Sequence, residues 1–276
     1  MANVLIEENT MIAIANAIRG KTGKTDLILP KDMAGEIESI VVGGGTGGNV
    51  TETGEILDSW ETIAANVENG TATSVYDVGT FKMLDITNSD GSTESIPMEI
   101  VAHNHDDKAD GTGKATLTFL AKNLLNKSMG IDSDSSSRWG WTATDARKWL
   151  NGEFLTTLPS DLQTAITMVS KLSDNGYTST LTSSIITTQD KVWIPSYSEV
   201  ISTQTTIIGE QGELYPCFSD DNSRIRKLVG GSADDWWLRT AYEKNNKNYY
   251  YVNGQGYVSN IVLSNPYVYF IIGFCI

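Results

Sequence analysis

The chain has 276 residues, a hydrophobic content of 40% and a formal net charge of -14, from 34 acidic and 20 basic residues. A chain of this length can bury a sizeable core, and no apolar run reaches the roughly 20 residues that a membrane-spanning helix needs. The acidic balance repels phosphate backbones and argues against nucleic-acid binding. The first residues lack the basic start and apolar core of a secretory signal, so we expect neither membrane insertion nor general export.

Residues 1–42 predict a small helical module. Asn9-Thr10 can cap one helix, and Pro30 suits the first turn of a second. Two helices this short bury little apolar surface alone, so we expect them to attach to another protein or to assemble with copies of themselves. An ordinary helical hairpin is the alternative. The glycine-rich residues 43–49 then predict a flexible linker and a domain boundary.

Residues 50–276 predict one mixed α+β domain with short helices and much loop. Strands are expected where β-forming residues stand between turn signals, at 76–78, 80–86, 96–102 and 115–120. Helices are expected after four capping pairs, Asp58/Glu61, Thr142/Asp145, Ser160/Gln163 and Ser196/Glu199. No internal repeat is evident, which disfavours a propeller or a solenoid.

Metal-type ligands gather at one place, His103-Asn104-His105-Asp106-Asp107. Two imidazoles beside carboxylates could begin a metal site, but a strand end where polar side chains secure a turn is the interpretation we favour. Asp132-Ser133-Asp134 is spaced like the start of a calcium loop, yet the glycine and the closing glutamate are missing. We therefore predict no metal and no cofactor.

Cys217 and Cys275 are the only cysteines. Two cysteines are too few for a disulfide scaffold in a chain of this length, and neither stands in a basic setting that would lower a thiol pKa. We expect two reduced thiols, while a single disulfide between them stays open. No phosphate-cradling glycine motif is present either, so we predict no catalytic residue and a protein that is not an enzyme.

The stretch 236–276 has two apolar ends and a polar, aromatic middle. Trp236-Trp237-Leu238 and 271–276 are strand-length apolar runs, and seven of the eleven tyrosines lie between Tyr242 and Tyr269 among Asn, Ser and Gly. Binding surfaces use this mixture, although the same tyrosines could simply pack an all-β face. We expect two buried strands, a hairpin turn at 254–256, and one exposed set of alternating side chains. The predicted ligand-binding residues are Tyr242, Asn245, Asn246, Tyr249, Tyr251, Asn253, Tyr257, Asn260, Val262, Ser264, Tyr267 and Tyr269.

The order of these features resembles the variable proteins of diversity-generating retroelements. In that family a tryptophan-rich segment, here Trp236-Trp237-Leu238-Arg239-Thr240, precedes a mutagenised run, and the chain closes in a segment similar to Gly273-Phe274-Cys275-Ile276. The pattern departs at Tyr269-Phe270, where the family usually has Gly-Val. The resemblance continues upstream in 100–106, 147–151 and 192–196. It implies a C-type-lectin-like fold with a variable segment at about 240–270.

The resemblance also implies a function. Residues 14–34 are similar to segments of phage tail-associated proteins, so the expected protein is a receptor-binding, tail-fibre-type protein located in the virion tail. Its expected partners are a host cell-surface protein or glycan and other tail proteins, the latter through the N-terminal module, and the expected assembly is a homotrimer. A bacterial cell-surface adhesin with the same domain is the alternative. A formylglycine-generating-type enzyme, which shares a related fold, is the less favoured one.

Overall fold

The computed structural model describes residues 48–88, 91–133, 140–174, 185–202, 210–245 and 247–276, together with Ala15 and Leu29. Apart from those two residues, the predicted N-terminal module lies outside the described part, as does most of the predicted linker. The described part combines short helices with small, mainly antiparallel sheets, which confirms the α+β class. None of its helices is long and apolar enough to cross a membrane.

The central sheet is antiparallel and has the strand order β1-β2-β3-β11. Its strands are β1 (Phe81–Thr87), β2 (Thr93–His103), β3 (Leu117–Ala121) and β11 (Gly273–Cys275). Three of the predicted strands are therefore confirmed. The predicted strand at 76–78 is wrong, because the helix α4 (Ala72–Val75) ends there and the Tyr76 hydroxyl is held by Asp58 at 2.7 Å.

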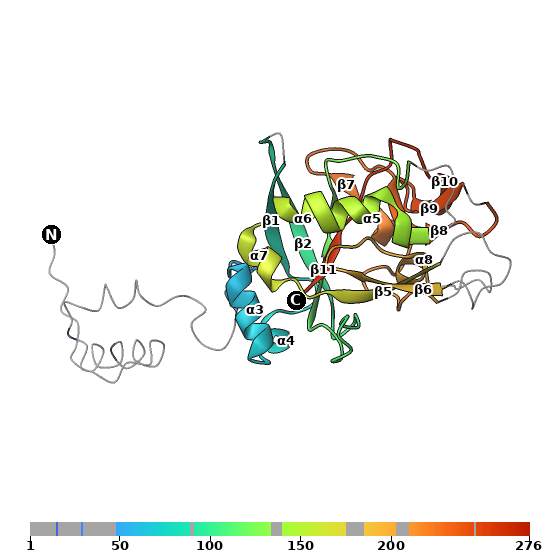
Figure 1. Ribbon diagram of the computed structural model, residues 1–276. Helices are drawn as coiled ribbons and strands as arrows, with labels where there is room; N and C mark the ends of the chain where they lie inside the picture. The colour runs from blue at the N-terminus through green and yellow to red at the C-terminus, as the bar shows by residue number, and fades with distance from the viewer. Residues whose placement is uncertain are drawn as a thin grey trace, which may run out of the picture.

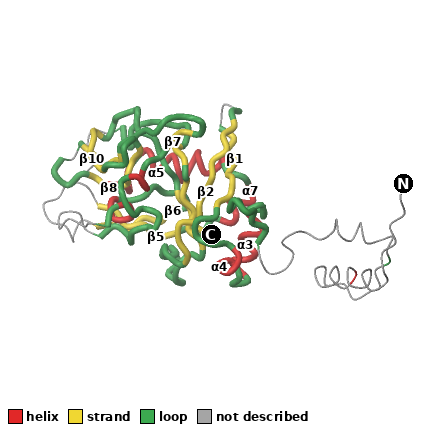
Figure 2. The backbone as a smooth tube through the Cα atoms, turned by 180° about the vertical axis from the view of Figure 1, so that it is seen from behind, coloured by secondary structure: helices red, strands yellow, loops and turns green. Residues whose placement is uncertain are grey.

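A second antiparallel sheet has the order β10-β9-β8 and contains the predicted hairpin. Its strands are β8 (Trp236–Ala241), β9 (Asn248–Val252) and β10 (Val258–Val262). Two short pairs complete the strands: β5 (Val169–Asp174) with β6 (Ile185–Asp190), and β4 (Asn123–Leu124) with β7 (Lys227–Leu228). Figures 1 and 2 show α3 and α4 at one end of this domain and β8–β10 at the other.

The helices are short, and one is of an unusual type. They are α3 (Trp60–Glu68), α5 (Asp145–Trp149), the π-helix η2 (Leu150–Phe154), α6 (Leu155–Thr157), α7 (Ser160–Ala165) and α8 (Tyr197–Val200), with 3-10 turns η1 (Gly140–Ala143) and η3 (Asn222–Arg224). The Ser196/Glu199 capping box is confirmed. The other three caps are displaced by one or two residues: Ser59 caps α3, Thr144 caps α5, and Pro159 precedes α7 without a side-chain cap.

One hydrophobic core runs under both sheets. At the α3 end, the rings of Trp60, Phe119 and Phe274 lie in mutual contact, with centroids 5.3 to 5.5 Å apart. At the other end, the two apolar runs predicted to bracket the variable segment are buried throughout, Trp236–Leu238 in β8 and residues 271–276 in and around β11. The last residues of the chain are thus part of the central core.

Candidate functional site

The predicted ligand-binding residues divide into three groups in the structure. The exposed members are Asn245, Tyr257, Val262, Ser264 and Tyr267, and the Tyr267 side chain is 77% exposed. The half-buried members are Tyr242, Tyr251, Asn253, Asn260 and Tyr269. Asn246 lies outside the described residues, and Tyr249 is fully buried.

The prediction for Tyr249 was wrong because β9 is the middle strand of its sheet and is covered on both faces. Tyr249 lies opposite Ala241 and Ile261 and is 0% exposed. On the other face, the ring of Tyr250 packs against Tyr197 and Tyr242, with centroids 4.9 and 5.3 Å away. Strand alternation alone predicts one solvent face, but here neighbouring segments close that face as well.

The exposed residues gather mainly at one end of the β9–β10 hairpin. The Leu263 amide donates to the Lys247 carbonyl at 2.8 Å, which holds the turn before β9 beside the turn after β10. Asn245 stands in the first turn, and Val262, Ser264 and Tyr267 stand in or next to the second. We call these four residues the hairpin-end surface. Tyr257 lies at the opposite end of the hairpin, roughly 17 Å away at 3.3 Å per strand residue.

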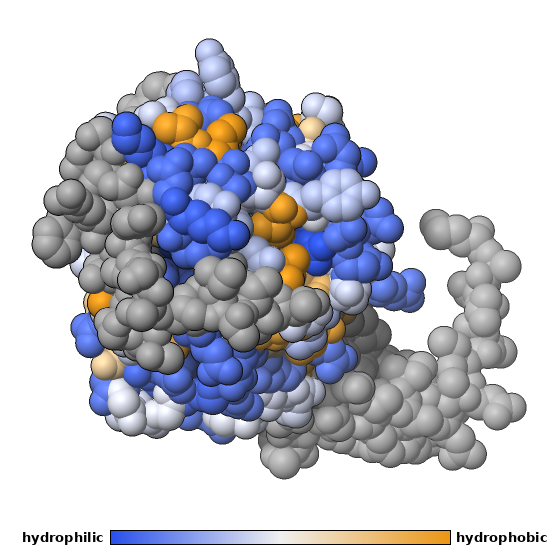
Figure 3. All heavy atoms as spheres, turned by 90° about the vertical axis from the view of Figure 1, so that its right-hand side faces the viewer, coloured by the Kyte–Doolittle hydropathy of each residue, from blue (hydrophilic) through white to orange (hydrophobic). Residues whose placement is uncertain are grey.

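Figure 3 views the molecule from the β8–β10 end. The described surface is mostly hydrophilic and carries a few separate hydrophobic patches. Isolated apolar side chains are normal on a protein surface. A surface of this kind suits a polar ligand that a few aromatic or aliphatic groups anchor.

A charged cluster that the sequence analysis did not predict lies beneath this end of the fold. It consists of Asp106, Lys171, Glu199 and Arg239, whose side chains are between 0% and 5% exposed. Lys171 Nζ bonds Asp106, Glu199 at 3.1 Å and the Tyr215 hydroxyl at 2.7 Å. Arg239 meets both oxygens of Glu199, at 2.5 and 2.9 Å. Two carboxylates and two cations make the cluster neutral.

The partners hold these groups in their charged forms. Burial by itself would raise the pKa of Asp106, but the Lys171 ammonium together with hydrogen bonds from His105, Lys171 and Thr118 outweighs burial and holds that pKa well below its usual value. Burial likewise opposes ionisation of Glu199, yet Arg239 and then Lys171 lower its pKa. Burial acts to lower the pKa of Arg239, but the charge and hydrogen bonds of Glu199, together with Tyr215 and Asp106, raise that pKa above its usual value. Because all three ammonium hydrogens of Lys171 are engaged, the cluster is suited to holding segments together rather than to proton transfer.

The cluster fixes the strand from which the hairpin extends. Arg239 is a β8 residue, and its guanidinium also donates to the carbonyls of Leu172, Ile194 and Gln211 at 3.1, 2.8 and 2.8 Å. Glu199 at the same time accepts from the Ser196 amide at 2.9 Å and completes the α8 capping box. The sequence did hold a signal for this pair. Arg239 stands inside the apolar run Trp236–Ala241, and a buried arginine almost always has an acidic partner.

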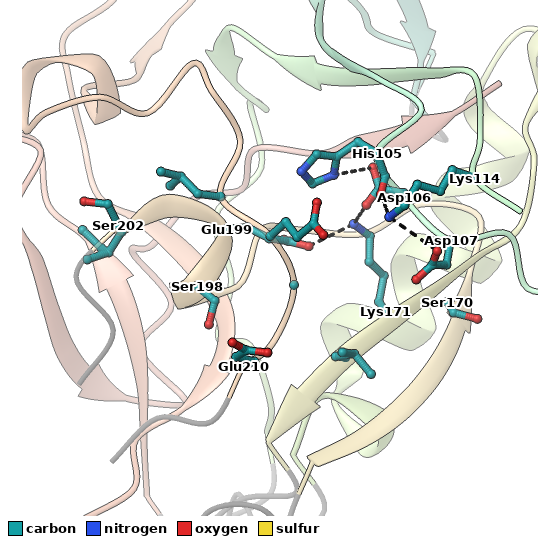
Figure 4. Close-up of a pocket in the computed structure, with 15 residues that line it drawn as sticks. His105, Asp106, Asp107, Lys114, Ser170, Lys171, Ser198, Glu199, Ser202 and Glu210 are labelled. Atoms are coloured by element: carbon teal, nitrogen blue, oxygen red, sulfur yellow. Dashed lines mark hydrogen bonds and ion pairs between the residues drawn. The ribbon is translucent and has the colours of Figure 1, made fainter. Parts of the chain in front are cut away.

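A cavity of about 530 Å³ opens beside the cluster (Figure 4). Lys171 and Glu199 form its floor, and the exposed Glu210 and Glu213 lie at its mouth. The His105 imidazole lines the same cavity and packs on the Tyr215 ring, with centroids 4.6 Å apart. The cavity is therefore polar and carries an acidic rim.

The two histidines do not form a joint site. Asn104 between them adopts φ +49°, and His103 Nε2 contacts the Tyr76 carbonyl at 2.9 Å while His105 turns towards Tyr215. This is the turn-forming alternative of the sequence analysis. Within the described ranges, no group of three or more His, Cys, Asp and Glu side chains is arranged to hold a metal ion.

Both cysteines are free thiols. Burial raises the pKa of Cys217 to about 12, and burial with the nearby Asp106 carboxylate raises the pKa of Cys275 well above its usual value. The thiolate is the nucleophilic form of cysteine. Neither thiol is therefore activated in this fold.

The fold and the site together define an α+β domain in which a buried, neutral ion cluster supports a polar, aromatic hairpin. Residues 116–268 match the family described as "Domain of unknown function (DUF6273)". Because the match covers more than half of the 276 residues, the chain belongs to that family. No curated protein matches the chain, and no solved structure matches it.

Proposed function

We propose that this protein is a receptor-binding protein of the phage tail-fibre type that displays a diversified ligand-binding surface on a lectin-like scaffold. The observation that carries the proposal is the contrast within residues 236–276. The bracketing runs Trp236–Leu238 and 271–276 are buried, whereas the hairpin-end surface between them is exposed. Side chains that bind and side chains that hold the fold are thus different residues.

This separation has an energetic consequence. Substitution of an exposed side chain away from special backbone sites changes the free energy of unfolding by about 0.5 kcal/mol or less. Replacing a buried aromatic side chain costs about 3 to 5 kcal/mol. Positions such as Val262, Ser264 and Tyr267 can therefore vary in sequence without unfolding the domain, and a few of them would supply most of the binding energy.

The proposed partners are a host cell-surface protein or glycan at the hairpin end and other tail proteins at the N-terminal module. The proposed assembly is a homotrimer, located in the virion tail. A bacterial surface adhesin with the same domain would use the same surface. The mass of the full chain in solution tests the assembly role, because a monomeric protein would contradict it.

The raised thiol pKa values favour this proposal over an enzyme of the formylglycine-generating type. Such an enzyme needs reactive cysteines, whereas Cys217 and Cys275 are protonated at neutral pH by the burial described above. Alkylating the protein under native conditions and then measuring its binding would separate the two functions. We expect binding to persist after the treatment.

Cell binding tests the proposal directly. Fluorescently labelled full chain is mixed with a panel of intact bacterial cells of both envelope types, and bound label is measured. We expect binding to some strains, with at least a tenfold loss in the variant Asn245→Ala/Val262→Ser/Tyr267→Ser. The matched control is Val229→Ser, which changes a side chain that is 59% exposed outside the hairpin. Binding to no strain, or equal binding by the triple variant, would refute the proposed surface.

Population sequencing tests the diversification. The 3′ end of the gene is sequenced in many isolates, and substitutions are mapped onto the structure. We expect them at the exposed and half-buried positions of the hairpin and not in the two buried runs. A neighbouring reverse transcriptase gene would support diversification, and neighbouring tail genes would favour the virion over the adhesin.

A further inference from the structure

The π-helix η2 (Leu150–Phe154) lines a second cavity, whose residues are distant in sequence from the hairpin end. This cavity measures about 260 Å³ and is lined by Trp149, Glu153 and Phe154 from the helical segment and by Glu94 and Asn126 from other segments. π-helical turns are rare and occur frequently at functional sites. The cavity therefore merits a functional explanation.

The π-turn builds the aromatic side of the cavity. Residues five apart on an α-helix point about 140° away from each other at 3.6 residues per turn. In this chain Trp149 and Phe154 are five apart, yet their ring centroids lie 5.0 Å from each other. The wider i to i+5 repeat of the π-turn brings the two rings together. The Trp149 ring is half-buried and also packs on Phe270 at 5.8 Å.

The widened turn is held in place from behind. The Asn151 side chain accepts from the amides of Lys191 and Val192 at 2.8 and 3.2 Å and donates to the Val192 carbonyl at 2.8 Å. These bonds tie η2 to the segment after β6. The aromatic pair and Glu153 are therefore presented on a fixed backbone, as a binding site requires.

Donors and acceptors of hydrogen bonds line the cavity together with the aromatic pair. The Glu94 carboxylate is half-buried, and its Oε2 accepts a hydrogen bond from the backbone amide of Asn126 at 2.9 Å. Burial raises the pKa of this carboxyl, and the hydrogen bond only partly offsets that rise. The exposed Glu153 adds a second acceptor, while the side chains of Asn126 and Thr157 can donate and accept. Partly desolvated acceptors of this kind gain most from ligand hydroxyl donors.

We propose that this cavity binds a single neutral pyranose ring. Sugar hydroxyls both donate and accept, which matches a lining that mixes carboxylate, amide and hydroxyl groups with the Lys127 ammonium. The apolar C–H face of a pyranose packs on aromatic rings such as Trp149. The volume supports one ring and no more, because pockets for drug-sized ligands begin at about 300 Å³. The inference does not depend on the proposed function of the hairpin end.

Titration of the full chain with methyl glycosides of glucose, galactose, mannose and N-acetylglucosamine tests this site. Binding is followed by saturation-transfer NMR and tryptophan fluorescence. We expect at least one glycoside to saturate the protein with a millimolar dissociation constant, typical of about 4 kcal/mol of binding free energy. No saturation by any of the four at about 50 mM would overturn the proposal.

Variants locate the bound sugar. Glu153→Gln changes an exposed side chain and is expected to fold normally, while weakening binding about tenfold, as the loss of a charged hydrogen bond predicts. Glu94→Gln is a second variant with the same expected direction. Glu213→Gln, at the mouth of the other cavity, and Val229→Ser, which changes an exposed side chain outside both cavities, are controls that should bind as the unmodified chain does. Unchanged binding in both cavity variants, or an equal loss in either control, would overturn the assignment.

Discussion

The buried cluster gives the sharpest test of how this fold is held together, and Lys171→Met is the perturbation of choice. Methionine keeps the length and apolar stem of lysine and removes only the ammonium. In the native protein that ammonium bonds Asp106, Glu199 and the Tyr215 hydroxyl and lies 3.5 Å from the centroid of the Trp193 ring. Its removal leaves the cluster with one net negative charge.

The cost follows from what the remaining groups can still do. Glu199 keeps both bonds to Arg239, so it stays compensated. Asp106 keeps hydrogen bonds from Thr118 at 2.7 Å and Tyr215 at 3.0 Å but loses its only adjacent permanent cation among the described residues. Removing one partner of a buried ion pair costs about 3 to 5 kcal/mol. We expect Lys171→Met to lose this amount at pH 7.

Urea unfolding at pH 7, followed by tryptophan fluorescence and far-UV circular dichroism, measures the loss through the linear extrapolation. The double variant Lys171→Met/Asp106→Asn removes the uncompensated charge, so it should lose about 2 kcal/mol less than the sum of the two single variants. Lys148→Met, which breaks an exposed pair with Asp145, is the control and should cost under about 0.5 kcal/mol. A loss below about 1 kcal/mol for Lys171→Met, or strict additivity in the cycle, would refute the reasoning.

Three further predictions concern a buried hydroxyl, two buried carboxylates and a constrained glycine. Tyr249→Phe should be neutral or stabilising in urea unfolding. The buried Tyr249 hydroxyl has no hydrogen-bond partner among the residues that the structure describes, so its removal relieves a desolvation cost of about 1 kcal/mol. A loss above about 1 kcal/mol would contradict this prediction. The folded protein holds the pKa values of Asp106 and Glu199 below their ordinary 3.8 and 4.5. The stability that these two carboxylates contribute should therefore be complete above about pH 5 and be lost as the pH falls through their pKa values in the folded protein. The urea midpoint, measured from pH 7 to pH 3, checks this. Gly256→Ala should lower the free energy of unfolding by at least about 2 kcal/mol, because φ is +86° there and an added Cβ would collide with backbone atoms of the neighbouring loop. The control Gly152→Ala places its Cβ in open space and should change the free energy of unfolding little. Equal urea midpoints for the two variants would contradict this.

The sequence predicted the elements whose signals are local. The strands β1, β2 and β3, the β9–β10 hairpin and the α8 capping box were found because periodicity, turn residues and cap residues lie within a few positions of one another. The apolar composition of Trp236–Leu238 and of residues 271–276 likewise predicted that both runs are buried. The cap of α3 was misplaced by one residue because Asp58 bonds the distant Tyr76 hydroxyl instead of its own helix.

The features that the sequence did not predict depend on contacts between distant segments. Tyr249 is buried because β9 is the middle strand of its sheet and other segments cover both of its faces, which no local pattern encodes. The ion cluster joins residues that are up to 133 positions apart, Asp106 and Arg239, through intermediates on β5 and α8. On β5 the alternation is even inverted, with Lys171 buried and Leu172 37% exposed. Hydropathy alone would orient that strand the wrong way.

The position of Arg239 separates the groups that fix β8 from the exposed end of the hairpin. This residue follows the buried Trp236–Leu238 run and immediately precedes the segment that leads to the hairpin. Its side chain bonds Glu199 and three backbone carbonyls, and its own amide donates to the Pro195 carbonyl at 2.9 Å. None of these partners belongs to the hairpin-end surface. The geometry of β8 is therefore set by groups that a substitution at the hairpin end does not touch, and substitutions at Val262 or Tyr267 should change what is bound without changing where β8 lies.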